Sequence, residues 1–175
     1  MSNSIPRPTW DDTWLSVART VARRSLCVRD QVGAVIVNAD NRIIATGYNG
    51  SPQGFNHWNK KCIEWCDRAQ VTALTSFVVE DAKKTPVGVS YDPDYHDCPS
   101  LHAEANALSV CDRTVRERGT IYVTSAVCFG CAKLIANSGL LRVVVDGGTQ
   151  ERAPHRNAGK SYEFLKSCGL QVEFR

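Results

Sequence analysis

The sequence lacks the features that mark membrane, secreted or multidomain proteins. No apolar run approaches the roughly 18 residues that a membrane-spanning helix needs, and the N-terminal MSNSIPRPTWDD has neither the basic start nor the apolar stretch of a secretory signal. Excess positive charge is also absent: 21 Lys and Arg against 18 Asp and Glu leave a net charge of +3, which does not support a nucleic-acid coat or a polybasic membrane anchor. No repeat and no Gly-, Ser- or Pro-rich linker divides the 175 residues. We therefore expect one domain spanning residues 1–175 in a cytoplasmic protein.

Cysteine, by contrast, is abundant, with eight residues in the chain. Because thiols persist in a reducing compartment, metal ligation is favoured over the alternative of a disulfide scaffold. Cys111 and Cys168 fall at apolar positions of expected helices, so core packing explains both. The candidate ligands are then Cys27, Cys62, Cys66, Cys98, Cys128 and Cys131.

Hydrophobic spacing divides the chain into a definite order of helices and strands. It predicts helices at 9–24, 101–111, 128–138 and 160–168, and strands at 33–37, 42–46, 120–124, 141–145 and 170–174. Thr9 and Asp12 have the spacing of a capping box, and Gly139 is a typical helix stop. The weakly patterned segment 57–98 indicates a Cys/His-rich insert, with one helix expected near 68–80. This order favours an α/β fold with a single mixed sheet and helices on both faces.

The strongest chemical pattern is His102-Ala-Glu104, followed 24 residues after the glutamate by Cys128-Phe-Gly-Cys131. Two cysteines three residues apart share a helix face and can bind one metal, and a helix N-terminus favours their thiolate form. One imidazole and two thiolates supply three ligands for Zn²⁺ and leave the fourth tetrahedral position to water. Glu104 can then act as the catalytic acid and base. This pattern is the signature of zinc-dependent nucleobase deaminases, although a structural zinc knuckle with a solvated Glu104 is the alternative.

Several longer stretches are similar to deoxycytidylate (dCMP) deaminases. They are Arg24-Ser-Leu-Cys27, Gln31-Val-Gly-Ala-Val-Ile-Val37, Thr46-Gly-Tyr-Asn-Gly-Ser-Pro-Gln-Gly54, Leu101-His-Ala-Glu-Ala-Asn-Ala107 and Cys131-Ala-Lys-Leu-Ile-Ala-Asn-Ser-Gly139. The resemblance runs from about residue 9 to 146. It implies the three-layer α-β-α cytidine-deaminase fold with a five-stranded mixed sheet, hydrolysis of dCMP to dUMP with release of ammonia, and a homohexamer.

The resemblance also assigns residues to the substrate. It implies that Asn49 meets the sugar, that Arg24 and Ser25 meet the phosphate, and that Ala103 lies in the substrate-binding segment. A guanidinium suits a phosphate because it offers paired N–H donors. The alternatives are that Arg24 is a cation at a helix end and that Asn49 is a turn residue that tolerates a left-handed backbone.

Two positions depart from the family pattern. Val127 stands where the family carries proline before the first cysteine, and proline would stiffen that turn. The segment 146–152 lacks the tyrosine that the family usually places near the base. These departures leave open which cytosine nucleotide is accepted, with 5-modified dCMP and dCTP as alternatives to dCMP.

The resemblance further implies a second, structural zinc. Its candidate ligands are Cys27, His57, Cys62, Cys66, His96 and Cys98. Such a site would pin the insert to the rest of the domain. The alternative is that these cysteines are buried free thiols.

The same family often responds to dCTP as activator and dTTP as inhibitor. Asn49, Gly50 and Gly54 fit such an effector site, but the turn that they form explains the glycines equally well.

Two other functions of the protein remain as alternatives. One is a deaminase acting on a base in RNA or DNA, which would need a channel or patch for the flanking backbone; the other is a non-catalytic zinc-binding module.

Overall fold

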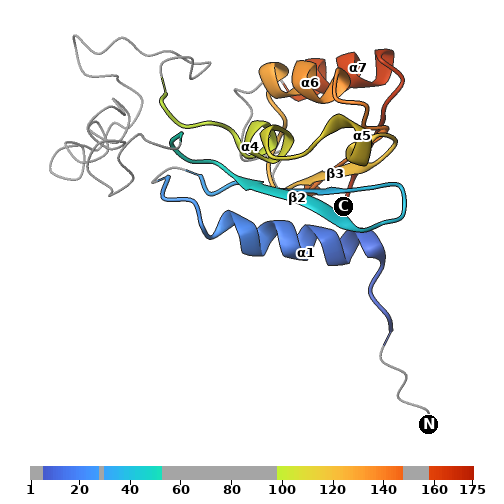
Figure 1. The fold of residues 1–175 in the computed structure, drawn as a ribbon, viewed down its shortest axis with the longest axis horizontal. Helices are drawn as coiled ribbons and strands as arrows, with labels where there is room; N and C mark the ends of the chain where they lie inside the picture. Colours follow the sequence, from blue (N-terminus) through green and yellow to red (C-terminus); the bar gives the residue numbers. More distant parts are fainter. Residues whose placement is uncertain (1–5, 28–29, 53–97, 148–157) are drawn as a thin grey trace, which may run out of the picture.

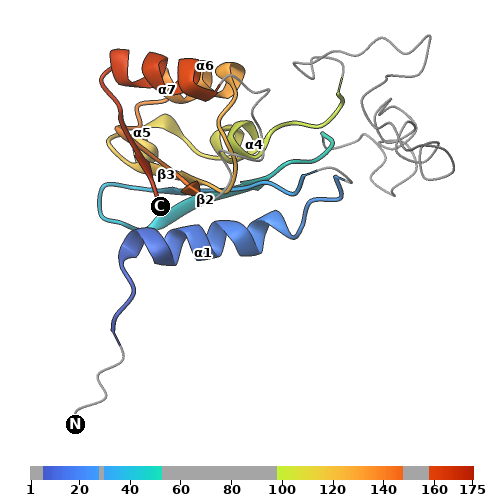
Figure 2. The same ribbon diagram turned by 180° about the vertical axis from the view of Figure 1, so that it is seen from behind.

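The computed structural model describes residues 6–27, 30–52, 98–147 and 158–175, which form three layers. A five-stranded sheet lies in the middle, with helix α1 (Trp10–Ala22) on one face and α4 (Ala103–Ser109), α6 (Phe129–Ala136) and α7 (Ala158–Ser167) on the other (Figures 1 and 2). A short helix, α5 (Arg113–Arg116), follows α4. The predicted α/β fold with helices on both faces of the sheet is confirmed. Across the described residues, no helix is long and apolar enough to cross a lipid bilayer.

The sheet is mixed, with the strand order β2-β1-β3-β4-β5. Its strands are β1 (Gly33–Val37), β2 (Ile43–Tyr48), β3 (Thr120–Val123), β4 (Arg142–Val145) and β5 (Gln171–Phe174). β1 pairs antiparallel with β2 and with β3, whereas β3, β4 and β5 run parallel. All five residues of β1 are buried, because helices cover both sides of this central strand. The strands predicted at 33–37 and 42–46 thus pair with each other as an antiparallel hairpin.

Most boundaries agree with the sequence to within two residues. Thr9 caps α1, and both halves of the capping box with Asp12 form. Gly139 follows α6 with a φ of +90°, the left-handed conformation that glycine adopts without strain. One expectation needs correction, because β2 continues to Tyr48 rather than ending at 46. In addition, the sequence did not predict α5, because four residues are too few to show a helical period. The helix expected near 68–80 lies outside the described residues, as does all of the insert except Cys98.

Two glycines let the flanking helices lie directly on the sheet backbone. A Cβ on Gly33 of β1 would lie 2.1 Å from the carbonyl oxygen of Ala18 in α1. A Cβ on Gly47 of β2 would lie 2.3 Å from the carbonyl oxygen of Ala103 in α4. Both distances are far below van der Waals contact, so any side chain at these positions would push its helix away. Gly47 thereby fixes how closely the first turn of α4 approaches β2.

The α1 side of the sheet also contains a charged network centred on Arg142, the first residue of β4. Its guanidinium donates to both carboxylate oxygens of Asp11 in α1, at 2.8 and 2.7 Å, and to both oxygens of Glu173 in β5, each at 2.8 Å. The hydroxyl of Tyr122 donates to the same Asp11 carboxylate at 2.9 Å. The hydrogen bonds from Arg142 and Tyr122 outweigh burial and lower the pKa of Asp11 to about 2. The network joins α1 to three adjacent strands.

We expect Asp11→Asn to lower the free energy of unfolding by about 2 kcal/mol at pH 7, since each unit of pKa depression is worth about 1.4 kcal/mol. The ionised carboxylate stabilises the fold fully above its unfolded pKa, near 3.8, and this stabilisation is lost as the pH falls through about 2. The difference between wild type and variant should therefore shrink as the pH is lowered from 4 to 2. Urea titrations across this range measure it, with exposed Asp40→Asn as the control. A difference that stays constant with pH would contradict the prediction.

Candidate metal and active site

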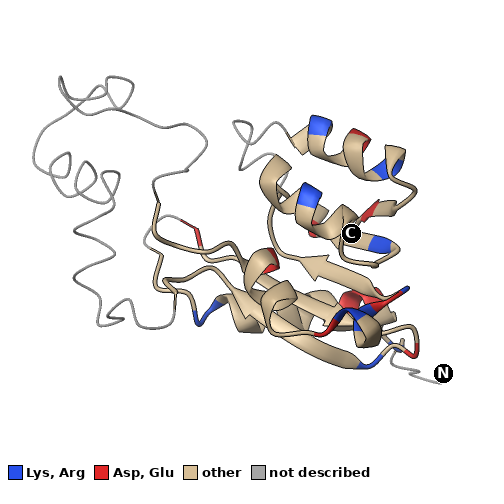
Figure 3. Ribbon diagram, turned by 45° about the horizontal axis from the view of Figure 1, so that its top comes forward, with Lys and Arg blue, Asp and Glu red and all other residues tan. Residues whose placement is uncertain are grey.

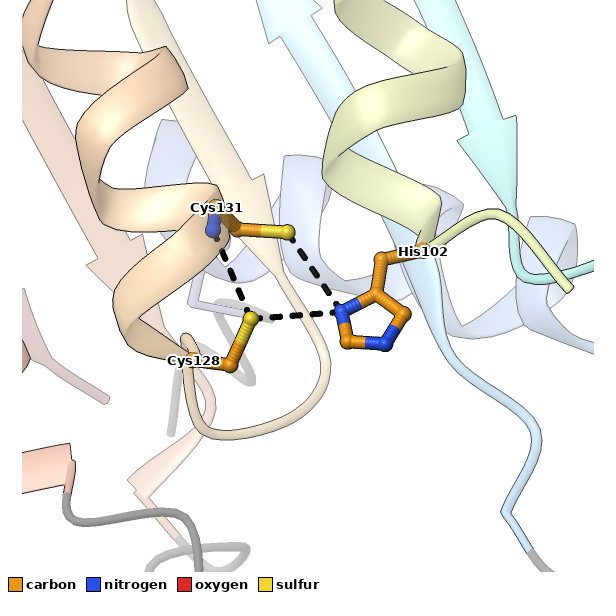
Figure 4. Close-up of side chains that lie close together, drawn as sticks. All are labelled: His102, Cys128 and Cys131. Carbon is orange, nitrogen blue, oxygen red and sulfur yellow. Dashed lines mark hydrogen bonds between the residues drawn. The ribbon is translucent and has the colours of Figure 1, made fainter. Parts of the chain in front are cut away.

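Three side chains converge where α4 and α6 begin. His102 is the N-cap residue of α4, Cys128 is the N-cap residue of α6, and Cys131 lies in the first turn of α6. Nδ1 of His102 lies 3.3 Å from Sγ of Cys128 and 3.4 Å from Sγ of Cys131 (Figure 4). Residues 26 and 29 positions apart in the sequence thus meet at the ends of two helices. The structure brings together all three metal ligands that the sequence predicts.

The spacing of these three atoms fits a tetrahedral zinc ion. With Zn–N near 2.0 Å and Zn–S near 2.3 Å, tetrahedral geometry separates a nitrogen from a sulfur ligand by roughly 3.5 Å. The two observed Nδ1···Sγ distances come within a few tenths of an ångström of this value. Among the described residues, this is the one group of three or more His, Cys, Asp or Glu side chains whose ligand atoms lie close enough to hold a metal. The donor set and its geometry therefore suit Zn²⁺.

The site favours thiolate sulfur. The backbone N–H of Cys131 donates a hydrogen bond to the Cys128 sulfur at 3.4 Å. This N–H lies in the first turn of α6, where N–H groups have no acceptor within the helix. Hydrogen bonding from the Cys131 thiol and from His102 lowers the pKa of Cys128. The hydrogen bond between the two cysteine side chains raises the pKa of Cys131, and so do its burial and the charge of Glu104. One thiolate is thus already stabilised by the protein, and a dication would stabilise the second.

Glu104 lies in the first turn of α4, two residues after the histidine ligand. Its side chain is buried, with 3% of the residue exposed, and it interacts with Cys131. A solvated carboxylate, the alternative considered from the sequence, is therefore excluded by its burial. A buried acid beside a metal ligand is rare unless it has a chemical role. This placement puts a carboxylate next to the three residues that could hold a metal.

The residues expected at the substrate lie on adjoining loops at the same end of the sheet. Gly50 exchanges two backbone hydrogen bonds with Leu101, of 3.1 and 2.9 Å, which places the loop after β2 beside His102. The Asn49 amide oxygen accepts from the backbone N–H of Val32, and its nitrogen donates to the carbonyl of Asp30, both at 2.8 Å. Asn49 therefore holds this loop together and still has a second amide hydrogen and a second lone pair.

The phosphate candidates differ in their exposure. Arg24 is exposed in the turn after α1. Ser25 is buried, and its hydroxyl donates to the Asn49 carbonyl at 2.7 Å while its backbone N–H donates to Ala22 at 2.9 Å. A phosphate contact by Ser25 stays a prediction that would require one of these bonds to break. Ala103, the first residue of α4, is buried directly after the histidine ligand.

The expected second metal site and effector site lie only partly within the described residues. Cys27 and Cys98 are both partly buried. His57, Cys62, Cys66 and His96, and the effector candidate Gly54, lie outside the described residues. Both of these sites remain predictions.

The contacts that hold the turn carrying Cys128 were not predicted from the sequence. Thr124 exchanges two hydrogen bonds with the backbone of Gly33, at 2.9 and 3.0 Å. Ser125 donates to the carboxylate of Asp30 at 3.3 Å. The backbone N–H of Val127 donates to the hydroxyl of Tyr162 at 3.4 Å. The available signal was Val127 itself, because a residue that replaces proline brings an N–H that needs an acceptor.

Comparison with known proteins agrees with this geometry. The family model of the cytidine and deoxycytidylate deaminase zinc-binding region matches residues 8–146. The deoxycytidylate deaminase of Mycobacterium phage D29 is 41% identical over 141 residues, which cover 80% of this chain and 96% of that protein. The deoxycytidylate deaminase of Saccharomyces cerevisiae is 32% identical over 170 residues, covering 96% of this chain and 45% of the yeast protein.

Solved structures agree on the fold. The dCMP deaminase from cyanophage S-TIM5, in its apo form, superposes with a TM-score of 0.63 at 23% identity and covers 97% of this chain and 100% of the phage chain. The chain therefore belongs to the deoxycytidylate deaminases, within the zinc-binding family of cytidine and deoxycytidylate deaminases.

Proposed function

We propose that the protein hydrolyses dCMP to dUMP and ammonia. The observation that carries this proposal is the buried Glu104 beside a His102–Cys128–Cys131 site with zinc geometry. The chain's identity to named deoxycytidylate deaminases selects this reaction among those that such a site can support.

The protein's own residues supply the proton transfers. When bound, zinc would act as a Lewis acid that lowers the pKa of water and so makes a nucleophile available near neutral pH. Glu104 accepts a proton from the attacking water at a carboxylate oxygen and delivers it to the ring nitrogen next to C4 of the base. The water oxygen forms a bond to C4. Glu104 then takes the proton that remains on this hydroxyl and passes it to the exocyclic amine, so that the C4–N bond breaks, ammonia leaves and the C4 carbonyl forms. Burial of Glu104 keeps bulk water from competing for these protons.

Substrate binding falls to the loops around residues 24 and 49. Asn49 offers its remaining amide hydrogen and lone pair to the sugar hydroxyl. Arg24, with five donors in a planar fork, binds the phosphate. Ser25 and Ala103 contribute to the same surface. The Ser25 hydroxyl donates to the carbonyl of Asn49, and Ala103 lies between His102 and Glu104 in the chain.

Finer features follow from the family rather than from the described residues. We propose a single domain over residues 1–175 that includes the 57–98 insert, a second structural zinc held by residues from the set given above, and a cytoplasmic homohexamer. Regulation by dCTP and dTTP at Asn49, Gly50 and Gly54 belongs to the same proposal.

A deaminase acting on nucleic acid is less well supported. Lys and Arg residues in the described part of the chain are distributed over several elements and mixed with Asp and Glu (Figure 3). A nucleic-acid channel would instead require a continuous run of positive charge along the backbone path. Turnover of a free nucleotide separates the two functions.

Substitution of Glu104 by Gln tests the proton-transfer role. We expect E104Q to bind zinc and keep its fold but to lose roughly a thousandfold or more in kcat, because the amide cannot accept the proton. Ammonia release, zinc content and thermal unfolding are measured together, with exposed Glu117→Gln as the control. Full activity in E104Q would remove Glu104 from the mechanism and favour a non-catalytic zinc module.

Loss of a sulfur ligand tests the metal site. We expect Cys131→Ser to lower the zinc content by one equivalent per chain and to abolish turnover, since serine binds zinc far more weakly than a thiolate does. Cys168→Ser, an exposed thiol at the end of α7, should keep both zinc and activity. Zinc is measured by atomic emission after dialysis against a weak chelator. Unchanged zinc content in C131S would show that the metal lies elsewhere.

A panel of substrates tests the nucleotide assignment and the role of Arg24. Among dCMP, CMP, dCTP, deoxycytidine and 5-substituted dCMP, we expect dCMP to have the highest kcat/KM. Arg24→Gln should lower kcat/KM for dCMP by about 10- to 100-fold, the range for a lost charged hydrogen bond, and leave deoxycytidine unchanged. The neighbouring exposed Arg23→Gln is the matched control. If another nucleotide reacts and dCMP does not, Val127 and the segment 146–152 are the places to examine.

A further inference from the structure

The turn between β3 and α6 delivers Cys128 to the metal site, and hydrogen bonds hold both its start and its end. Three of these contacts lie at the two ends of the turn. Two of them lie at its start: Thr124 pairs with Gly33 of β1, and Ser125 donates to Asp30. The third lies at its end, where the backbone N–H of Val127 donates to the Tyr162 hydroxyl at 3.4 Å. This last contact is one residue from the sulfur ligand. It lies in the part of the turn that leads directly into Cys128.

Val127 occupies the position that proline holds in the zinc-deaminase signature. Proline would fix the backbone φ angle of this residue and would bring no N–H into the interior. Val127 has neither property, and it is completely buried, with 0% of the residue exposed. Its N–H therefore needs a partner inside the protein. Tyr162 supplies that partner.

The packing of the Tyr162 ring restricts the position of its hydroxyl. It lies on α7 with 7% of the residue exposed, and its ring packs in the same hydrophobic cluster as Val127. Phe174 of β5 meets the ring edge-on, with 5.0 Å between the ring centroids and 77° between the planes. Because the phenol oxygen moves only with the ring, these contacts limit how far the acceptor for Val127 can move.

We infer that Tyr162 is a positioning residue for the metal ligand Cys128. It acts through the Val127 N–H and replaces the stiffening that the proline ring provides in the signature. The inference rests on the proposed function only for its effect on turnover; its effect on the metal site is independent of the substrate. Tyr162 itself touches neither metal nor substrate in this role.

The test removes the hydroxyl and keeps the ring. We expect Tyr162→Phe to release zinc to a chelator about fivefold faster than wild type, consistent with loss of one hydrogen bond near a ligand. The Co²⁺-substituted variant should show shifted thiolate-to-metal and d–d absorption bands, because the Cys128 sulfur is less firmly placed. Ser161→Ala is the matched control. This neighbour on α7 is 0% exposed, and its hydroxyl has no hydrogen-bond partner among the described residues, so its removal should leave both readouts unchanged.

A double-mutant cycle with Val127→Pro separates positioning from general stability. Because proline has no N–H to donate, Y162F should have no further effect on zinc release or on the cobalt spectrum in the V127P background. Equal effects of Y162F in both backgrounds would overturn the inference. So would a Y162F variant that matches wild type in both metal readouts, and this single variant decides the question even if V127P fails to fold.

The metal readouts also keep the inference distinct from the proposed function. A wild-type protein that binds zinc but deaminates no nucleotide in the panel would refute the function and leave the Tyr162 comparison intact. Conversely, an active enzyme with identical zinc release in wild type and Y162F would refute only the positioning role.

Discussion

The structure depends most on how it brings three candidate ligand atoms, of His102, Cys128 and Cys131, close enough together to hold one small cation. The atoms come from residues 26 and 29 positions apart, so no local segment can supply them. The fold meets this requirement by starting two helices, α4 and α6, at neighbouring points on one side of the sheet. Each helix contributes its N-cap residue as a candidate ligand, and the N–H groups in the first turn of α6, which have no acceptor within the helix, favour negative sulfur. The starts of α4 and α6 thus account both for the positions of the candidate ligand atoms and for the preference for thiolate sulfur.

The sheet sets where those helices begin. Gly47 lets the first turn of α4 touch the backbone of β2, and the Gly50–Leu101 pair fixes the residue just before His102. On the other side, Thr124 continues the pairing of β3 with β1 and defines where the turn to α6 starts. Backbone contacts of this kind tolerate little movement. The main chain therefore limits where the imidazole and the sulfurs can lie, and such restriction of ligand positions lowers the ordering cost of binding a metal.

Much of the site could be predicted from sequence because its signals are local. Spacings of two residues in His102–Glu104 and three in Cys128–Cys131 show directly which side chains share a helix turn. The Arg142 network could not be predicted, since Asp11 lies 131 positions away and an arginine at the start of a strand looks like a surface residue. The environment of Asn49 could be predicted only in part. Its loop was evident, but its hydrogen bonds to Asp30 and Val32 depend on a tertiary contact that spacing does not reveal.

Departure from a signature has consequences that the signature does not state. Replacing proline by valine before Cys128 changes two quantities at once, because the backbone gains freedom and the core gains a donor. Either change alone would loosen the metal ligand or leave a buried N–H without an acceptor. The Tyr162 hydroxyl compensates for both changes, since its hydrogen bond restricts the backbone at Val127 and gives the buried N–H an acceptor. Phe174 packs against the ring that carries this hydroxyl. A variant signature is therefore best judged together with the side chain that the new backbone group contacts, and here that side chain lies 35 residues further along the chain.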